Sequence, residues 1–146
     1  MACSTKFLVM LFMRQTELIN FSGISIGRRL DQLAVEELDL LDFGVIGFDR
    51  EGIVCRYNRF ESRFADLRPE RVIGRPLFTV VAPCMNNALI AAQFEQALAD
   101  NTSMDCELNY VLTLRMRPVR VRLRLVAAPE LQLRYVLVQR ASPDQI

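Results

Sequence analysis

The chain has 146 residues, of which 51% are hydrophobic and 24% are charged, a composition typical of one globular domain and not of a disordered protein. Its 18 basic and 17 acidic residues give a net charge of +1, which argues against a protein that binds nucleic acid or membranes through bulk charge. Histidine is absent, so hydrolysis by Ser-His-Asp or Cys-His groups, phosphotransfer through histidine and most catalytic zinc sites are excluded.

The chain is expected to divide into a leader or N-terminal cap at 1–30, one main domain at 31–140 and a polar tail at 141–146. Within the leader, Phe7 to Met13 form an apolar run of seven residues, whereas a membrane span needs about 20. The cysteines are widely and irregularly spaced without a CxxC pair, which is typical of reduced thiols in a cytoplasmic protein. They are Cys3, Cys55, Cys84 and Cys106.

Three local patterns predict the first elements of the main domain. Residues 31–42 have helical apolar spacing and five acidic residues, so we expect an acidic amphipathic helix that Asp31 caps. Two β-rich runs, 43–48 and 53–57, flank the turn 49–52 that ends in glycine, which predicts a β-hairpin.

Two further helices are predicted from asparagine caps. Asn58 stands three residues before Glu61, the spacing of a capping box, so a helix should begin there and run to about Asp66. Asn86 or Asn87 should cap a longer helix at 88–100. The residues expected on its buried side are Leu89, Ala92, Phe94 and Leu98.

The last third of the chain predicts three strands, at 104–116, 119–126 and 131–138. Residues 119–125 alternate apolar and arginine side chains, which indicates a half-buried strand with one basic face. Strands separated by a helical block indicate an α+β fold with helices on one side of an antiparallel sheet.

A set of short motifs links this element order to a known family. The spacing between a Tyr-Asn-x-x-Glu motif and a Val-Ala-Pro-Cys motif about 25 residues downstream is the most specific part of the pattern. These motifs, and the stretch from Leu40 to Arg140 as a whole, resemble the photoactive yellow protein family of PAS-domain blue-light receptors. The resemblance implies a PAS fold, with a five-stranded antiparallel sheet and an N-terminal helical cap. The matching positions are Phe43, Gly44, Phe48, Asp49, Gly52, Tyr57, Asn58, Glu61, Val72 to Gly74, Val81 to Cys84, Phe94, Tyr110, Met116 and Pro118.

The resemblance also implies a site and a function. It makes Cys84 the attachment point of a para-hydroxycinnamoyl group (from para-hydroxycinnamic acid, p-coumaric acid), held as a thioester, and makes Tyr57 and Glu61 the hydrogen-bond donors to its phenolate. Light would isomerise this chromophore, Glu61 would give it a proton, and the N-terminal cap would be released toward an unknown downstream signalling protein. Such a protein is not an enzyme. The pocket would be lined by Ala65, Leu67, Leu77, Ala82, Pro83, Tyr110, Leu112, Leu114 and Met116.

Each of the three main site residues also has an ordinary structural explanation. A lone cysteine such as Cys84 is most often a small buried hydrophobe, although a position just before a helix would favour its thiolate. Glu61 could simply complete the capping box with Asn58, and Tyr57 could be a core tyrosine bonded to the backbone. In the functional interpretation, an apolar pocket keeps the Glu61 carboxyl neutral so that it can donate a hydrogen bond.

The chain departs from the family pattern at several pocket positions. Ala65 stands where the family usually has a threonine hydroxyl, and Leu67 where it has an arginine over the phenolate. Leu77, Leu112 and Leu114 replace aromatic residues. A pocket without this hydroxyl and this positive charge should hold an anion less firmly, so we expect a larger fraction of neutral phenol or an altered recovery after light.

A stripe of arginines along two adjacent strands could form a nucleic-acid or partner surface. No aromatic residues are interleaved with it, so we expect a solvated sheet face that the acidic segment 31–42 partly neutralises. The stripe consists of Arg115, Arg117, Arg120, Arg122 and Arg124. Neither nucleic acid nor a membrane is therefore expected as a partner.

Two other functions remain open at this stage. A PAS domain of this kind could bind a different small ligand or only protein partners. Cys84 could alternatively serve as a thiol redox sensor.

Overall fold

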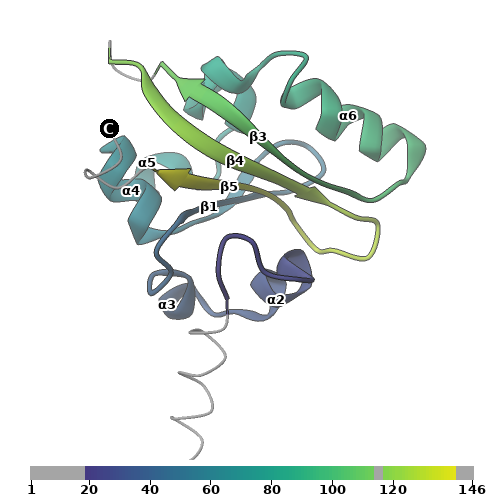
Figure 1. Ribbon diagram of the computed structural model, residues 1–146, viewed down its shortest axis with the longest axis horizontal. Helices are drawn as coiled ribbons and strands as arrows, with labels where there is room; N and C mark the ends of the chain where they lie inside the picture. The colour runs from purple at the N-terminus through teal and green to yellow at the C-terminus, as the bar shows by residue number, and fades with distance from the viewer. Residues whose placement is uncertain (1–18, 114–116, 141–146) are drawn as a thin grey trace, which may run out of the picture.

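The computed structural model describes residues 19–113 and 117–140, and its centre is a five-stranded antiparallel sheet (Figure 1). The spatial order of the strands is β2-β1-β5-β4-β3. The N-terminal hairpin therefore pairs through β1 with the last strand, so that the two ends of the main domain meet in the middle of the sheet. The strands are β1 Gly44–Phe48, β2 Val54–Tyr57, β3 Met104–Leu112, β4 Val119–Ala127 and β5 Arg134–Arg140.

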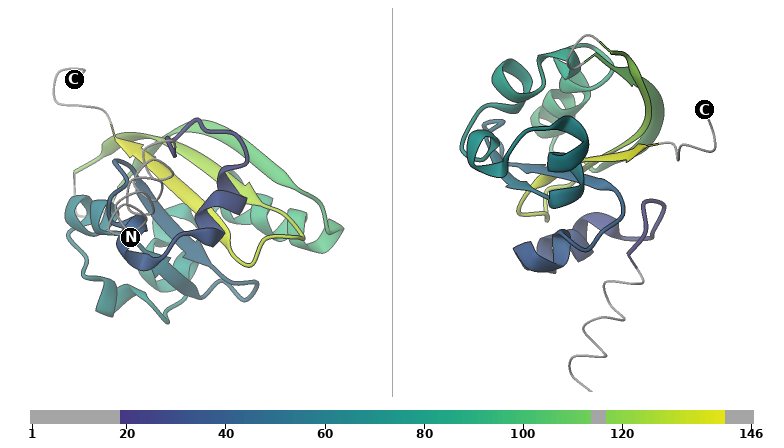
Figure 2. Two further views of the ribbon diagram at one scale, coloured as in Figure 1. Left: turned by 90° about the horizontal axis from the view of Figure 1, so that it is seen from below. Right: turned by 90° about the vertical axis from the view of Figure 1, so that its left-hand side faces the viewer.

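Helices cover both faces of this sheet unequally (Figures 1 and 2). The helical block between β2 and β3 packs on one face, and a short N-terminal cap packs on the other. This is the α+β architecture that the sequence predicted, with a five-stranded antiparallel sheet and an N-terminal helical cap. The helices are α2 Ile26–Gln32, α3 Val35–Leu38, α4 Arg59–Ala65, α5 Pro69–Val72, η1 Leu77–Val81, η2 Pro83–Met85 and α6 Ala91–Asp100.

Each face of the sheet has its own hydrophobic core. On the helical face, the rings of Phe48 and Phe94 meet edge to face with centroids 4.9 Å apart, and Phe78 packs against Phe48 at 5.5 Å. On the opposite face, Phe21 and Leu30 of the N-terminal cap are buried together with Tyr135 of β5. Residues 19–41, which include α2 and α3, therefore belong to the folded unit and form its N-terminal cap.

The predicted single helix at 31–42 is wrong. The chain forms α2 and α3 with a break at Leu33, whose backbone is extended. The guanidinium of Arg56 donates to the carbonyls of Leu30, at 2.6 Å, and of Leu33, and so satisfies the carbonyls at the end of α2. Asp31 lies inside α2 instead of capping it, and its carboxylate accepts from the hydroxyl of Tyr135 at 2.5 Å.

The elements that follow were predicted largely correctly. The hairpin forms as expected, with Gly52 at φ +83°, and the Asn58 side chain caps α4. α6 starts at Ala91, later than predicted. The side-chain oxygen of Asn87 accepts hydrogen bonds from the amides of Leu89 and Ile90, which form a turn ahead of the helix. Its buried side consists of Ala91, Phe94 and Ala97, whereas Leu89, Ala92 and Leu98 are exposed, contrary to expectation.

The alternating strand β4 has the predicted apolar and basic faces, with exceptions at Val119, which is exposed, and at Arg124. Val121 and Leu123 are buried, while Arg120 and Arg122 are exposed. Arg124 is only 7% exposed, because the N-terminal cap lies over it. Strand β3 ends at Leu112. Several segments named in the predictions lie outside the described residues: 114–116 with Arg115, Cys3, Phe7 to Met13 and the tail 141–146.

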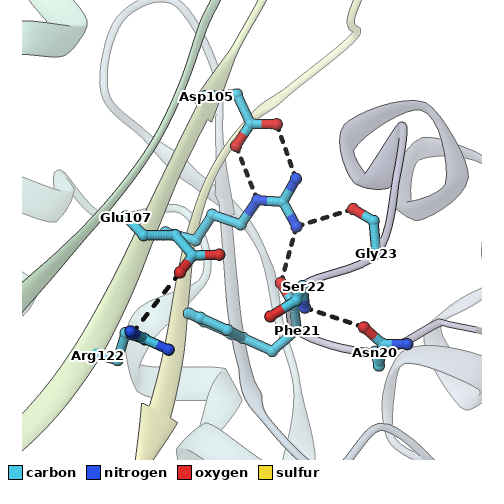
Figure 3. A network of polar contacts seen from close by, with 8 residues as sticks. Asn20, Phe21, Ser22, Gly23, Asp105, Glu107 and Arg122 are labelled. Atoms are coloured by element: carbon cyan, nitrogen blue, oxygen red, sulfur yellow. Dashed lines mark hydrogen bonds and ion pairs between the residues drawn. The ribbon is translucent and has the colours of Figure 1, made fainter.

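Arg124 makes four hydrogen bonds, of which two join β4 to the N-terminal cap and two bind Asp105 of the neighbouring strand β3 (Figure 3). Its guanidinium forms a fork with the Asp105 carboxylate, with both distances 2.7 Å, and donates to the carbonyls of Phe21 at 2.8 Å and Gly23 at 2.9 Å. Arg122 pairs with Glu107 at 3.7 Å. The carboxylates paired with these two arginines come from β3, not from segment 31–42 as predicted. Within the described ranges, no helix has the length and apolar content needed to cross a bilayer.

Candidate functional site

Tyr57 and Glu61 lie together at the junction of β2 and α4. Tyr57 is the last residue of β2, and Asn58 starts α4 by accepting a hydrogen bond from the amide of Glu61 at 3.2 Å. The two residues are about one helical turn apart, and the Tyr57 hydroxyl lies 3.5 Å from the Glu61 carbonyl oxygen. Tyr57 is 5% exposed and Glu61 is 2% exposed.

The Glu61 carboxylate does not complete the capping box. The amide of Asn58 already donates to the carbonyl of Val45 at 3.1 Å, so the usual partner of a capping-box glutamate is taken. The carboxylate turns instead to Arg140 at the end of β5, whose Nη2 donates to Oε1 at 2.8 Å. The helix-cap explanation of Glu61 is therefore wrong for its side chain, although it holds for Asn58.

Two features of the environment of Glu61 have opposite effects on the pKa of its carboxyl. Burial raises the pKa of the Glu61 carboxyl above its ordinary value, and the charge and hydrogen bond of Arg140 oppose that rise. Burial likewise raises the pKa of Tyr57, so its phenol stays neutral and able to donate. In the ion pair of Glu61 and Arg140, two buried side-chain atoms have no hydrogen-bond partner among the described residues. They are Oε2 of Glu61 and Nε of Arg140.

Gly44 of β1 makes room for the Glu61 side chain. A Cβ atom at position 44 would lie 2.1 Å from Oε2 of Glu61, well inside van der Waals contact. A larger residue at position 44 would therefore force the Glu61 carboxylate away from its place against the sheet.

Cys84 is a free, half-buried thiol on η2. Its carbonyl accepts two hydrogen bonds, from the hydroxyl of Tyr110 at 2.6 Å and from Nδ2 of Asn87 at 3.1 Å, which fix the short loop to β3. Because α6 begins only at Ala91, Cys84 does not lie at its N-terminus. The predicted place of Cys84 just before this helix is therefore wrong.

The predicted lining residues fall mostly into the core on the helical face. Cys84 packs against this core, which includes the ring of Tyr57. Leu77, Ala82 and Leu112 are buried members of it, and Leu67 and Tyr110 pack against it in half-buried positions. Ala65 is buried on α4, whereas Pro83 is exposed because η2 begins at the surface. Leu114 and Met116 lie outside the described residues.

The other described cysteines lack the features of a nucleophile. Cys55 on β2 is exposed, and its partial desolvation together with the charge of Asp49 raises the pKa of its thiol. Burial and Asp105 raise the pKa of the half-buried Cys106. In the part of the chain that the structure describes, no three histidine, cysteine or acidic residues gather in a way that could hold a metal ion.

Two comparisons with known proteins place this geometry in a family. A family model described as the PAS fold matches residues 38–139. The photoactive yellow protein of Rhodobacter capsulatus is 31% identical over 104 residues, which cover 69% of this chain and 81% of that protein. The photoactive yellow protein of Rhodothalassium salexigens is 28% identical over 112 residues, or 77% of this chain and 89% of that protein.

A solved structure agrees with the sequence relatives. The photoactive yellow protein domain of the sensor histidine kinase Ppr from Rhodospirillum centenum superimposes with a TM-score of 0.72 at 36% identity. The match covers 79% of this chain and all of that domain. The chain therefore belongs to the photoactive yellow protein family of PAS-fold photosensors.

Proposed function

We propose that this protein is a blue-light photoreceptor that carries a para-hydroxycinnamoyl group as a thioester on Cys84. The observation that best supports this is the buried Oε2 atom of Glu61, which has no hydrogen-bond partner among the described residues. In the same part of the chain, the hydroxyl of Tyr57 makes one long contact, with the main-chain carbonyl of Glu61. Buried polar atoms are normally paired, so an unpaired one in this position points to a ligand with a hydroxyl or an oxyanion.

The described residues fit such a group. Its aromatic ring needs apolar surroundings, which the core of Leu77, Ala82 and Leu112 supplies. Its phenolic oxygen needs hydrogen-bond donors, which the neutral phenol of Tyr57 and the protonated carboxyl of Glu61 can supply. Its thioester needs a free thiol next to the same core, and Cys84 meets that requirement.

The chromophore, when bound, supplies light absorption and photoisomerisation, and the protein supplies the proton and the response. In the dark, Tyr57 and neutral Glu61 hold the phenolic oxygen. After light, Glu61 gives up its proton at Oε2 and keeps a buried negative charge. Asn58, three residues before Glu61, donates to the carbonyls of Leu38 at 3.0 Å and Phe43 at 2.9 Å, so a shift of α4 would reach the N-terminal cap directly.

Release of the cap would expose the second sheet face to a downstream signalling protein. The output is thus a change of shape and not substrate turnover. The reduced thiols favour a cytoplasmic setting for this response. Because Ala65 and Leu67 offer neither a hydroxyl nor a positive charge, we expect a larger fraction of neutral phenol at neutral pH than a pocket with both would give.

Reconstitution with thiol-activated para-hydroxycinnamic acid tests this assignment. We expect one adduct per chain by intact mass, mapped to the peptide that contains Cys84, together with a blue or near-ultraviolet absorption band. Cys84→Ser should abolish both, whereas the matched variant Cys55→Ser, at an exposed thiol, should keep both. Equal labelling of Cys84→Ser and the unaltered protein would contradict the assignment, and a peroxide-dependent mass change on Cys84 with no adduct would favour a redox sensor.

A further inference from the structure

The pair formed by Glu61 and Arg140 is the most completely buried ion pair among the described residues. Its side chains are 2% and 8% exposed, and Oε1 and Nη2 are 2.8 Å apart. Arg140 is also held from a second side, because its guanidinium carbon lies 5.3 Å from the ring centroid of Phe64 on α4. The guanidinium is thus held against α4 by two side chains of that helix.

A buried carboxylate of this kind is stable only beside a positive charge. Leaving it alone in the core would carry a large desolvation cost, which a hydrogen-bonded guanidinium offsets. Among the described residues, the phenol of Tyr57 on β2 also interacts electrostatically with Glu61, but it stays neutral. Arg140 is therefore the group that compensates a negative charge on Glu61.

The proton transfer proposed above creates such a charge. The proton leaves Oε2 of Glu61 for the phenolate oxygen of the chromophore, so the negative charge moves from that oxygen to the carboxylate and the total charge is unchanged. We infer that Arg140 is the built-in counter-ion of Glu61 in the state in which Glu61 has lost its proton, so that this photoreceptor stabilises its light-induced state through an ion pair that its own fold supplies. This inference rests on the proposed function for its role in light, but the pairing itself does not.

Arg140 is accordingly a positioning residue for the photocycle. By stabilising the ionised carboxylate, it lowers the drive to return the proton to Glu61 and slows recovery in the dark. Arg140 also compensates the negative charge on Glu61 that would otherwise disturb α4. The buried charge on Glu61 alone should therefore contribute less to cap release in this protein.

The first measurement uses the chromophore-free protein. Infrared spectra with isotope-labelled glutamate, and Glu61→Gln as the reference that removes the band, report whether Glu61 is ionised at neutral pH. We expect a carboxylate in the unaltered protein, and in Arg140→Met a titration midpoint about one to three pH units higher. Arg134→Met removes an arginine from the other end of the same strand and should leave the Glu61 band unchanged.

The stability of the chromophore-free protein should follow the same titration. A carboxyl whose pKa is raised by folding stabilises the protein below its unfolded pKa, and that stabilisation is lost as pH rises through the folded pKa. In Arg140→Met the loss should extend to higher pH than in the unaltered protein. Should Arg140→Met fail to fold, the double variant with Glu61→Gln is expected to fold again, because it leaves no unpaired charge.

The second measurement uses the loaded protein. After a light flash, we expect dark recovery of Arg140→Met to be about tenfold faster or more, since one pH unit in the Glu61 midpoint corresponds to a factor of ten. Arg140→Lys, which keeps the charge but loses the planar guanidinium, should fall between, and Arg134→Met should recover at the normal rate.

Several results would overturn the inference. In the infrared measurement they are a protonated Glu61 in the chromophore-free protein at neutral pH, or a Glu61 titration that Arg140→Met leaves unchanged. In the folding measurement it is a double variant that fails to fold where Arg140→Met alone also fails. In the flash measurement it is an unchanged recovery rate in Arg140→Met. Failure of the protein to load chromophore would instead contradict the proposed function, and the infrared titration would still decide whether Arg140 is the counter-ion.

Discussion

Replacing Asn58 with alanine is expected to lower the free energy of unfolding by about 4 kcal/mol, because it leaves buried backbone groups of three elements without partners. The side chain is 1% exposed and makes four hydrogen bonds. Its oxygen accepts from the amides of Val45 and Glu61, and its nitrogen donates to the carbonyls of Leu38 and Phe43. Asn58 therefore ties the N-terminal cap, β1 and α4 to one another.

Urea unfolding of the chromophore-free protein measures this loss. Asn87→Ala is the matched control, since Asn87 also accepts from two amides ahead of a helix but is exposed, and we expect it to cost about 1 kcal/mol. Asn58→Asp keeps both acceptor bonds but turns an oxygen toward the two carbonyls, so it should be no more stable than Asn58→Ala. Equal costs for Asn58→Ala and Asn87→Ala would refute the role of Asn58 as the link between the three elements.

Replacing Arg124 with methionine is expected to detach the N-terminal cap from the sheet. Methionine keeps much of the buried volume but leaves the carbonyls of Phe21 and Gly23 without their donor (Figure 3). Asp105 is half-exposed and can return to water, so the cost comes mainly from the two carbonyls and amounts to about 2–3 kcal/mol. We expect faster amide hydrogen exchange in α2, with smaller changes in the helical face of the sheet.

Arg122→Met is the matched control for this experiment. Arg122 lies two residues away on the same strand, but its pair with Glu107 is 3.7 Å long and its side chain is 53% exposed. Such surface pairs contribute about 0–1 kcal/mol, so exchange in α2 should stay unchanged. If both variants speed exchange in α2 equally, the sheet face as a whole, and not the Arg124 hydrogen bonds, holds the cap.

The elements that the sequence predicted well are those that local patterns specify. The hairpin follows from a turn that ends in Gly52, and α4 from the cap at Asn58, so each depends on neighbours a few residues apart. The break in the N-terminal helix could not be predicted in this way, because Arg56 ends α2 from a different element. The late start of α6 has a more local cause, a turn at Asn87 that competes with the helix.

The candidate site was predicted only in part for the same reason. The motif spacing indicated Tyr57, Glu61 and Cys84, and the structure brings Tyr57 and Glu61 together and packs Cys84 against the core that contains Tyr57. The pairing of Glu61 with Arg140 joins residues 79 apart in sequence, and that of Arg124 with Phe21 joins residues 103 apart. An arginine at the end of an apolar strand carries no signal of such a partner, since its pattern equally fits a solvent-exposed side chain.

The central claim is that light acting on a group at Cys84 drives a reversible change in this protein. Flash illumination of the reconstituted protein, followed by its absorption spectrum over time, tests it most directly. We predict loss of the ground-state band after the flash and its full return in the dark, and neither change in Cys84→Ser. A protein that carries the adduct on Cys84 but shows no reversible change of absorption after light would contradict the claim.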